Sequence, residues 1–182
     1  MGPLLAFSRA VDAVGHVFGK SAEWMVGLAC VISAGNAVVR YGLSMSSNGW
    51  LEVQWYLFAG TVMFGAPYTL LRNEHVRVDL IYGNLSERAR LWVDVFGIIF
   101  FLMPGMMLLA WMTWPFFWEA LVRGETSSNA GGLLRWPVKL VLPVGFAMLS
   151  LQGLSELIKR IALLKGEKPD VEIVVAYERP TQ

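Results

Sequence analysis

The chain has 182 residues, of which 55% are hydrophobic and only 16% are charged. A soluble domain usually has about 25% charged residues, so this composition argues against a soluble globular protein. The formal net charge of +1 gives no basic surface for nucleic acid, and the single cysteine excludes an internal disulfide framework.

The first twenty residues have a helical pattern of their own. Leu4, Phe7, Val11, Val14 and Phe18 recur at spacings of three and four residues, which places them on one stripe of a helix. This pattern predicts an amphipathic helix over residues 1–20 that lies in the membrane interface or docks on a partner. A secretory signal is the alternative, although the charged segment is long for one and no clear A-x-A cleavage site follows.

Four apolar segments follow, and a helix needs about 20 apolar residues to cross the ~30 Å hydrocarbon core. They cover residues 24–39, 51–71, 95–117 and 136–158. The first is short unless residues 41–43 extend it, and the fourth carries Lys139 near one end and Glu156 near the other. The sequence therefore predicts an all-α integral membrane protein, with a four-helix transmembrane domain over residues 21–160 and a cytoplasmic tail over residues 161–182.

The distribution of basic residues predicts the orientation of the chain. If both termini are cytoplasmic, only four of the 15 Lys and Arg residues fall on the opposite side, namely Arg40, Arg123, Arg135 and Lys139. Cytoplasmic loops normally hold the excess of basic residues, so an N-in, C-in topology is favoured. Lys159 and Arg160 are then expected to meet anionic headgroups.

The sequence offers few groups for chemistry. Both histidines lie outside the four apolar segments, where they could not ligate a transmembrane haem, and no cluster of metal-ligating residues is present. No carboxylate falls near the middle of an apolar segment, as a small proton-coupled exporter would require. The sequence predicts that this chain is not an enzyme and holds no cofactor or metal itself.

Several short motifs occur in a fixed order from residue 50 onward. Residues 50–55 (WLEVQW) open the second apolar segment, and residues 72–79 (RNEHVRVD) close it. Residues 124–128 (GETSS), 136–137 (WP), 142–146 (LPVGF) and 151–152 (LQ) follow. This ordered set resembles the small membrane subunit of TRAP transporters, the tripartite ATP-independent periplasmic carriers of organic acids, over residues 22–165.

The resemblance implies a scaffold subunit in the bacterial inner membrane that supports a larger one. The large membrane subunit would hold the sodium and substrate sites, a periplasmic binding protein would deliver the organic acid, and membrane lipids would surround both. One departure concerns Glu52, because Val53 follows it where many members of the family have a second glutamate.

Seven residues are candidate loop or partner contacts: Glu52, Arg72, His75, Arg77, Asp79, Glu125 and Ser127. A hydrogen bond between His75 and Asp79, with Arg77 nearby, is one hypothesis for how the cytoplasmic loop is fixed, and a solvated loop is the alternative. Glu125 and Ser127 either touch the periplasmic binding protein or are simply exposed to solvent. A stand-alone small transporter and a membrane anchor of another complex remain alternative functions.

Overall fold

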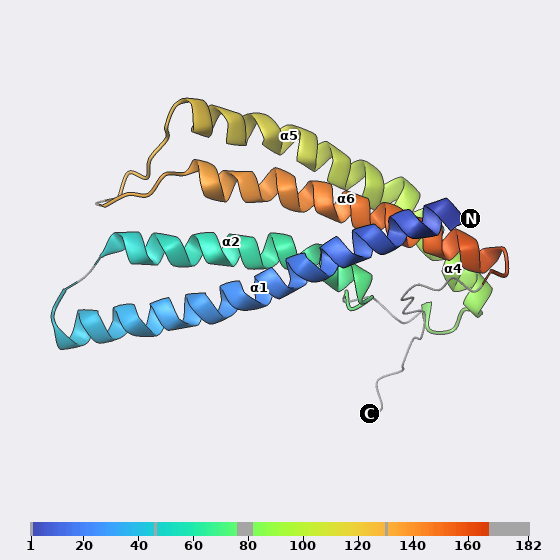
Figure 1. The fold of residues 1–182 in the computed structure, drawn as a ribbon, viewed down its shortest axis with the longest axis horizontal. Coiled ribbons are helices and arrows are strands. Elements are labelled where there is room, and N and C mark those ends of the chain that lie inside the picture. Colours follow the sequence, from blue (N-terminus) through green and yellow to red (C-terminus); the bar gives the residue numbers. More distant parts are fainter. Residues whose placement is uncertain (1, 46, 76–81, 130, 168–182) are drawn as a thin grey trace.

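The computed structural model describes residues 2–45, 47–75, 82–129 and 131–167. Within these residues the fold is all-helical, apart from one isolated bridge between Thr126 and Leu134 (Figure 1). The helices, in chain order, are α1 (Gly2–Gly42), α2 (Asn48–Leu71), α4 (Glu87–Gly97), the π-helical turn η1 (Ile98–Leu102), α5 (Met103–Val122) and α6 (Trp136–Leu164). The predicted all-α class is thus confirmed.

The predicted interfacial helix and the first apolar segment form one continuous helix, α1. Its N-terminal half packs on α2 and α6 through a face of small and polar residues, which includes Ser8, Asp12, Gly15 and Gly19. This packing buries only some residues of the predicted apolar stripe and leaves the others exposed. Val11 is buried and Phe18 meets Phe64 edge to face, whereas Leu4, Phe7 and Val14 are exposed. Whether the first twenty residues lie in the membrane interface stays a prediction.

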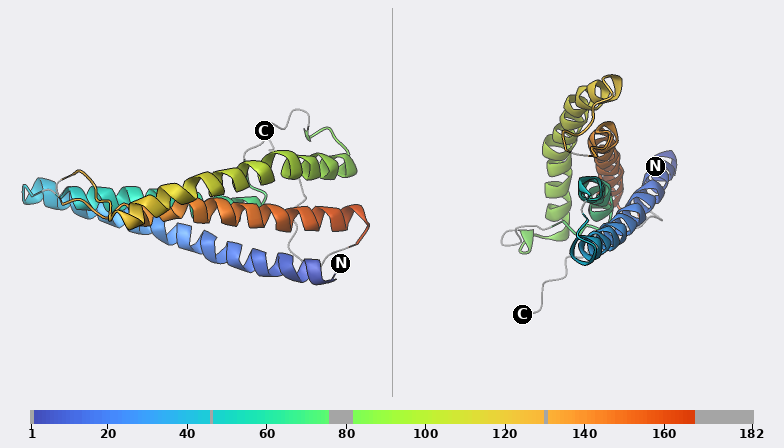
Figure 2. Two further views of the ribbon diagram at one scale, coloured as in Figure 1. Left: turned by 90° about the horizontal axis from the view of Figure 1, so that it is seen from above. Right: turned by 90° about the vertical axis from the view of Figure 1, so that its left-hand side faces the viewer.

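Helices α2 and α6 form the centre of the bundle, with α1 on one side of them and α5 on the other (Figure 2). Two glycines allow the central helices to approach their neighbours closely. A Cβ atom on Gly19 would lie 2.4 Å from the Tyr68 ring, and one on Gly145 would lie 2.7 Å from Met63. Small residues at such positions let membrane helices pack backbone against side chain.

The third apolar segment lies inside a longer helix that runs from α4 through η1 into α5. Ser86 caps the start of this helix, because its hydroxyl accepts a hydrogen bond from the Ala89 N–H at 3.4 Å. The π turn immediately precedes Pro104, which has no N–H to donate to the preceding turn. A π turn with Met103 N–H bonded to Ile98 carbonyl lets the helix continue at this point.

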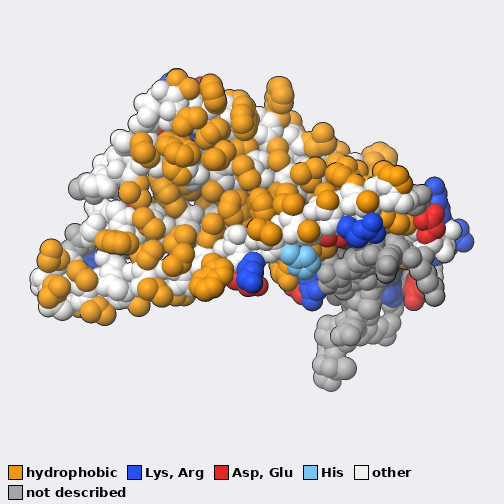
Figure 3. Space-filling view, viewed as in Figure 1, with side chains coloured by type: hydrophobic (Ala, Val, Ile, Leu, Met, Phe, Trp, Pro, Cys, Tyr) orange, Lys and Arg blue, Asp and Glu red, His pale blue; other side chains and the backbone are white. Residues whose placement is uncertain are grey.

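Among the described residues, three helices are long and apolar enough to cross a membrane: Gly2–Gly42, Glu87–Val122 and Trp136–Leu164, with mean hydropathies of 1.5, 2.2 and 1.5. The fourth long helix, α2, is not among them and carries Glu52, Gln54 and two tyrosines. Hydrophobic side chains spread over most of the visible surface, and charged ones gather toward the end that holds the N-terminus (Figure 3). The number of spans and the N-in, C-in topology stay predictions.

Candidate functional site

Five charged residues meet at the end of the bundle that holds the N-terminus. This ion cluster consists of Asp12 from α1, Asp94 from α4, and Glu156, Lys159 and Arg160 from α6. The Lys159 side chain is wholly buried, and its Nζ lies 3.1 Å from Asp12 Oδ2 and 2.5 Å from Glu156 Oε1. Lys159 therefore holds two carboxylates from two different helices.

Arg160 connects the same cluster to α4. Its Nε lies 2.9 Å from Asp94 Oδ2, and its Nη1 pairs with Glu156 Oε2. The Tyr82 hydroxyl donates to the other oxygen of Asp94 at 3.0 Å. Three helices that are distant in the sequence are thus joined by one chain of ion pairs.

Neutral polar side chains complete the ion cluster. Gln152 Nε2 donates to Asp12 at 3.0 Å and to Glu156 at 3.3 Å, and the Ser155 hydroxyl donates to Asp12 at 2.9 Å. On α1, the Ser8 hydroxyl donates to the Ser155 carbonyl at 3.4 Å. Since a buried charge is costly unless it is paired and hydrogen-bonded, this network explains how Asp12 is tolerated inside the bundle.

The ion cluster corrects the expectation that Lys159 and Arg160 face lipid headgroups, because the two residues are 0% and 4% exposed. The sequence contained a signal for it: Gln152, Glu156, Lys159 and Arg160 recur at three- and four-residue spacing on α6. Their partner Asp12, by contrast, lies on α1, 140 residues before Gln152 in the chain. Only the packing of α1 on α6 brings it to them.

A second group of polar residues lies at the opposite end of the bundle, around the loop between α5 and α6. In this loop site the Glu52 carboxylate, in the first turns of α2, accepts hydrogen bonds from the Ser127 hydroxyl, from Asn129 Nδ2 at 2.7 Å and from the Leu133 N–H at 3.0 Å. Two of the candidate contacts, Glu52 and Ser127, are therefore joined. Glu52 fixes the loop to α2.

Glu125 holds the other side of the loop site. Lys139 Nζ lies 2.5 Å from its Oε2 and Arg135 lies 3.3 Å from its Oε1. The hydrogen bond from Lys139, helped by the positive charges of Lys139 and Arg135, holds the pKa of Glu125 below its usual value. Lys139 Nζ also lies 3.9 Å from the centre of the Phe116 ring, which ties the loop site to α5.

Two more of the candidate contacts, Arg72 and His75, lie just beyond the end of α2. Arg72 makes a long ion pair of 3.9 Å with Glu74, and the two side chains are 38% and 64% exposed, so this pair contributes little. His75 is exposed and lines a cavity of about 560 Å³ together with Asp94 and Arg160. Arg77 and Asp79 lie outside the described residues, so the predicted contact between His75 and Asp79 stays a prediction.

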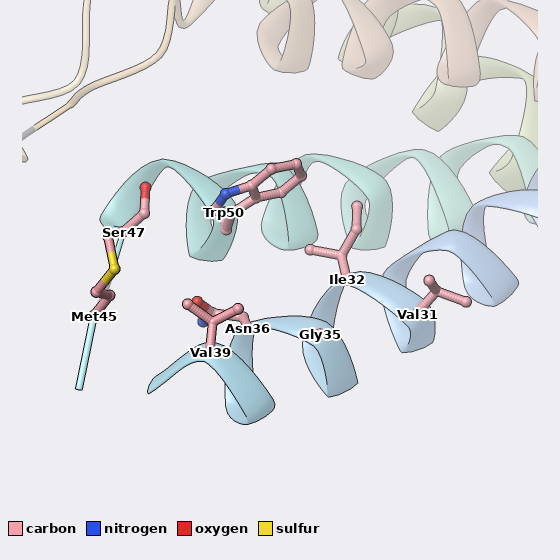
Figure 4. Close-up of a pocket in the computed structure, with 8 residues that line it drawn as sticks. All are labelled: Val31, Ile32, Gly35, Asn36, Val39, Met45, Ser47 and Trp50. Atoms are coloured by element: carbon pink, nitrogen blue, oxygen red, sulfur yellow. The ribbon is translucent and has the colours of Figure 1, made fainter. Parts of the chain in front are cut away.

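An apolar cavity of about 480 Å³ lies between the ends of α1 and α2 (Figure 4). Val31, Ile32, Val39 and Trp50 are among its lining residues, and Asn36 is one of its few polar ones. None of the described side chains that line it is titratable. Among the described residues no group of three or more metal-ligating side chains is found either.

Long apolar helices held together by internal ion pairs define a multi-pass integral membrane protein. A family model described as "Tripartite ATP-independent periplasmic transporters, DctQ component" matches residues 29–163. The chain belongs to this family, and it is a small TRAP transporter subunit of the inner membrane. No curated protein and no solved structure matches the chain. The family is one of transporter components rather than enzymes.

Proposed function

We propose that this chain is the scaffold subunit of a sodium-driven TRAP transporter that takes up organic acids. The observation that carries the proposal is the family match over residues 29–163. The ion cluster supports it, because its charged side chains are engaged with one another between helices. Such residues stabilise a rigid body more readily than they bind a passing substrate.

In this proposal the chain crosses the membrane four times, with α2 as the fourth span and both termini in the cytoplasm. The position of α2 supports counting it as a span, because it packs against both α1 and α6. Two of its polar residues, Glu52 and Tyr56, bond the loop before α6 and so need not face lipid. The ion cluster then lies at the cytoplasmic end of the bundle and the loop site at the periplasmic end.

The proposed division of labour leaves the chemistry of transport to partners. A large membrane subunit would bind sodium and the organic acid, and a periplasmic binding protein would deliver the acid. A rigid small subunit enlarges the static part against which the large subunit moves. The loop site, which lies at the proposed periplasmic end, is the part of this chain most available to the binding protein.

The test is to tag the chain, extract it gently from native membranes and identify the proteins that accompany it by mass spectrometry. Recovery of a large polytopic membrane protein in roughly equal amount is the expected result. Recovery with cofactor-bearing respiratory subunits would instead make the chain an anchor of another complex. If the folded chain is recovered alone and takes up substrate in proteoliposomes by itself, the scaffold proposal is wrong.

A further inference from the structure

A cavity of about 370 Å³ lies at the end of the bundle that holds the loop site. Trp55 and Ala59 of α2 line one side of it, and Phe116 of α5 lines the other. Helix α6, which lies between α2 and α5, forms its base (Figure 1). This space, here named the α2–α5 cavity, is left where two helices both pack on a third.

The α2–α5 cavity has a large apolar part that is open to the membrane. Ala59 of α2 and Val138 and Leu142 of α6 line this part. Trp55 and Phe116, which also line the cavity, are 72% and 49% exposed. Exposed apolar side chains on the helices of a membrane protein face lipid, so the cavity is accessible from the bilayer.

The polar end of the cavity lies at the depth of the lipid headgroups. It contains Arg135, which directly precedes the start of α6 at Trp136. Helix α6 is one of the helices long and apolar enough to cross a membrane, and Trp55 lies within the first turns of α2. Tryptophans gather at the membrane–water interface, near the ends of spanning helices. The apolar part of the cavity therefore reaches from this level into the hydrocarbon.

Arg135 has hydrogen-bond donors that the described part of the chain does not use. Its Nη1 donates to Glu125 at 3.3 Å, whereas its Nε and Nη2 have no hydrogen-bond partner among the described residues. The side chain is 42% exposed and lines the α2–α5 cavity. A guanidinium presents a planar fork of N–H donors that matches two oxygens of a phosphate group.

The charges around the cavity favour a ligand with a single negative charge. Arg135 and Lys139 line the cavity, and Glu125 pairs with both of them. The carboxylate of Glu52, which also lines the cavity, already accepts hydrogen bonds from the loop. Two cations against two carboxylates, beside the positive end of the α6 dipole, leave room for one further negative charge. A phosphodiester carries one, whereas a dicarboxylate carries two.

We propose that the α2–α5 cavity binds one phospholipid of the membrane. Its phosphate accepts hydrogen bonds from Arg135, and one acyl chain lies along Ala59 and Leu142 between α2 and α5. The bound lipid completes the bundle by filling the space beside α6. This inference goes beyond the proposed function, and it holds whichever partner proteins the chain serves.

Native mass spectrometry of the full chain, extracted from membranes in mild detergent with whatever accompanies it, tests the proposal. The wild-type chain should retain one phospholipid. Arg135→Gln should lower the retained amount roughly tenfold, because it removes charge-assisted hydrogen bonds to the phosphate. Arg123→Gln is the matched control, since Arg123 is 75% exposed at the same end of the bundle and pairs with Glu119. Equal retention by both variants would overturn the proposal.

A conservative variant keeps the test valid if Arg135→Gln fails to fold. Arg135→Lys retains the positive charge beside Glu125 but not the fork of donors, so it should hold less phospholipid than the wild type at equal thermal stability. Retention equal to that of the wild type would show that the fork does not hold the lipid.

Two further measurements separate a phospholipid from other occupants. Phospholipid added to the delipidated protein should raise its melting temperature, and inorganic phosphate or succinate at the same concentration should not. Equal protection by a free anion would make the cavity an anion site instead. A photoreactive amino acid at Trp55 should capture phospholipid in native membranes. Capture of another protein there, with no lipid, would show that a partner covers the cavity and would contradict the proposal.

Discussion

The ion cluster and the loop site use the same chemistry at opposite ends of the bundle, but they differ in burial. In the ion cluster Lys159 is wholly buried between Asp12 and Glu156. In the loop site the pairs of Glu125 with Arg135 and Lys139 are partly exposed. A buried charge that loses its partner has no water to replace it, whereas an exposed one is solvated again.

This difference assigns different roles to two similar sets of residues. The ion cluster joins α1, α4 and α6, which are distant in the sequence. The loop site fixes one loop to helices that are already packed. A change in the ion cluster is therefore expected to affect the whole subunit, and a change in the loop site to affect the loop alone.

The largest expected effect is that of Lys159→Met. This change leaves Asp12 and Glu156 buried without their shared cation, and breaking a buried pair in this way costs about 3–5 kcal/mol. The free energy of unfolding in detergent, and the yield of folded chain, should both fall. Lys165→Met is the matched control, because Lys165 is exposed at the end of α6. Equal stability of the two variants would show that the ion cluster is not essential to the bundle.

A double-mutant cycle between Asp12 and Lys159 has the next largest expected effect. Asp12→Asn should destabilise the wild-type chain more than it destabilises the Lys159→Met chain, because in the latter the cation that stabilised Asp12 is already gone. The difference should be about 0.5–3 kcal/mol, the usual range for residues in direct contact. Additive losses of stability would mean that the two groups do not interact in the folded protein.

Glu52→Ala tests the loop site, at the opposite end of the bundle from the ion cluster. It removes the acceptor of the hydrogen bonds from Ser127, Asn129 and Leu133, so hydrogen exchange in residues 124–135 should become faster. The helices should keep their protection. Glu119→Ala is the control, since its pair with Arg123 is exposed on both sides and contributes little. Loss of protection throughout the bundle would show that the loop site also determines the fold.

The smallest expected effect is a pH dependence of the loop. Because the pKa of Glu125 is lowered in the folded chain, its ion pairs stabilise the loop fully above the ordinary glutamate value of 4.5, and this stabilisation is lost as the pH falls below it. Exchange rates in residues 124–135, corrected for the intrinsic effect of pH, should rise in that range. Lys139→Met should abolish the part of this dependence that comes from Glu125. A transition near neutral pH would contradict the assignment to Glu125.

Some features follow from the sequence because they depend on local properties. Runs of apolar residues without charge form helices wherever they lie, since every backbone polar group in lipid must be satisfied within the helix. The helical regions around residues 51–71, 95–117 and 136–158 therefore appear as predicted. The ordered motifs also identified the family correctly, because they depend on the order of residues and not on their contacts.

Contacts between distant segments were decided only by the tertiary structure. Asp12 and Lys159 are 147 residues apart, and no local pattern indicates that α1 packs on α6 through a polar face. Likewise Glu52 and Ser127 are 75 residues apart and meet because α2 begins at the end of the bundle that holds the loop before α6. The sequence determined which segments are apolar helices, since that depends on solvent and hydrogen bonding. The packing determined which charges are buried together, since that depends on which faces meet.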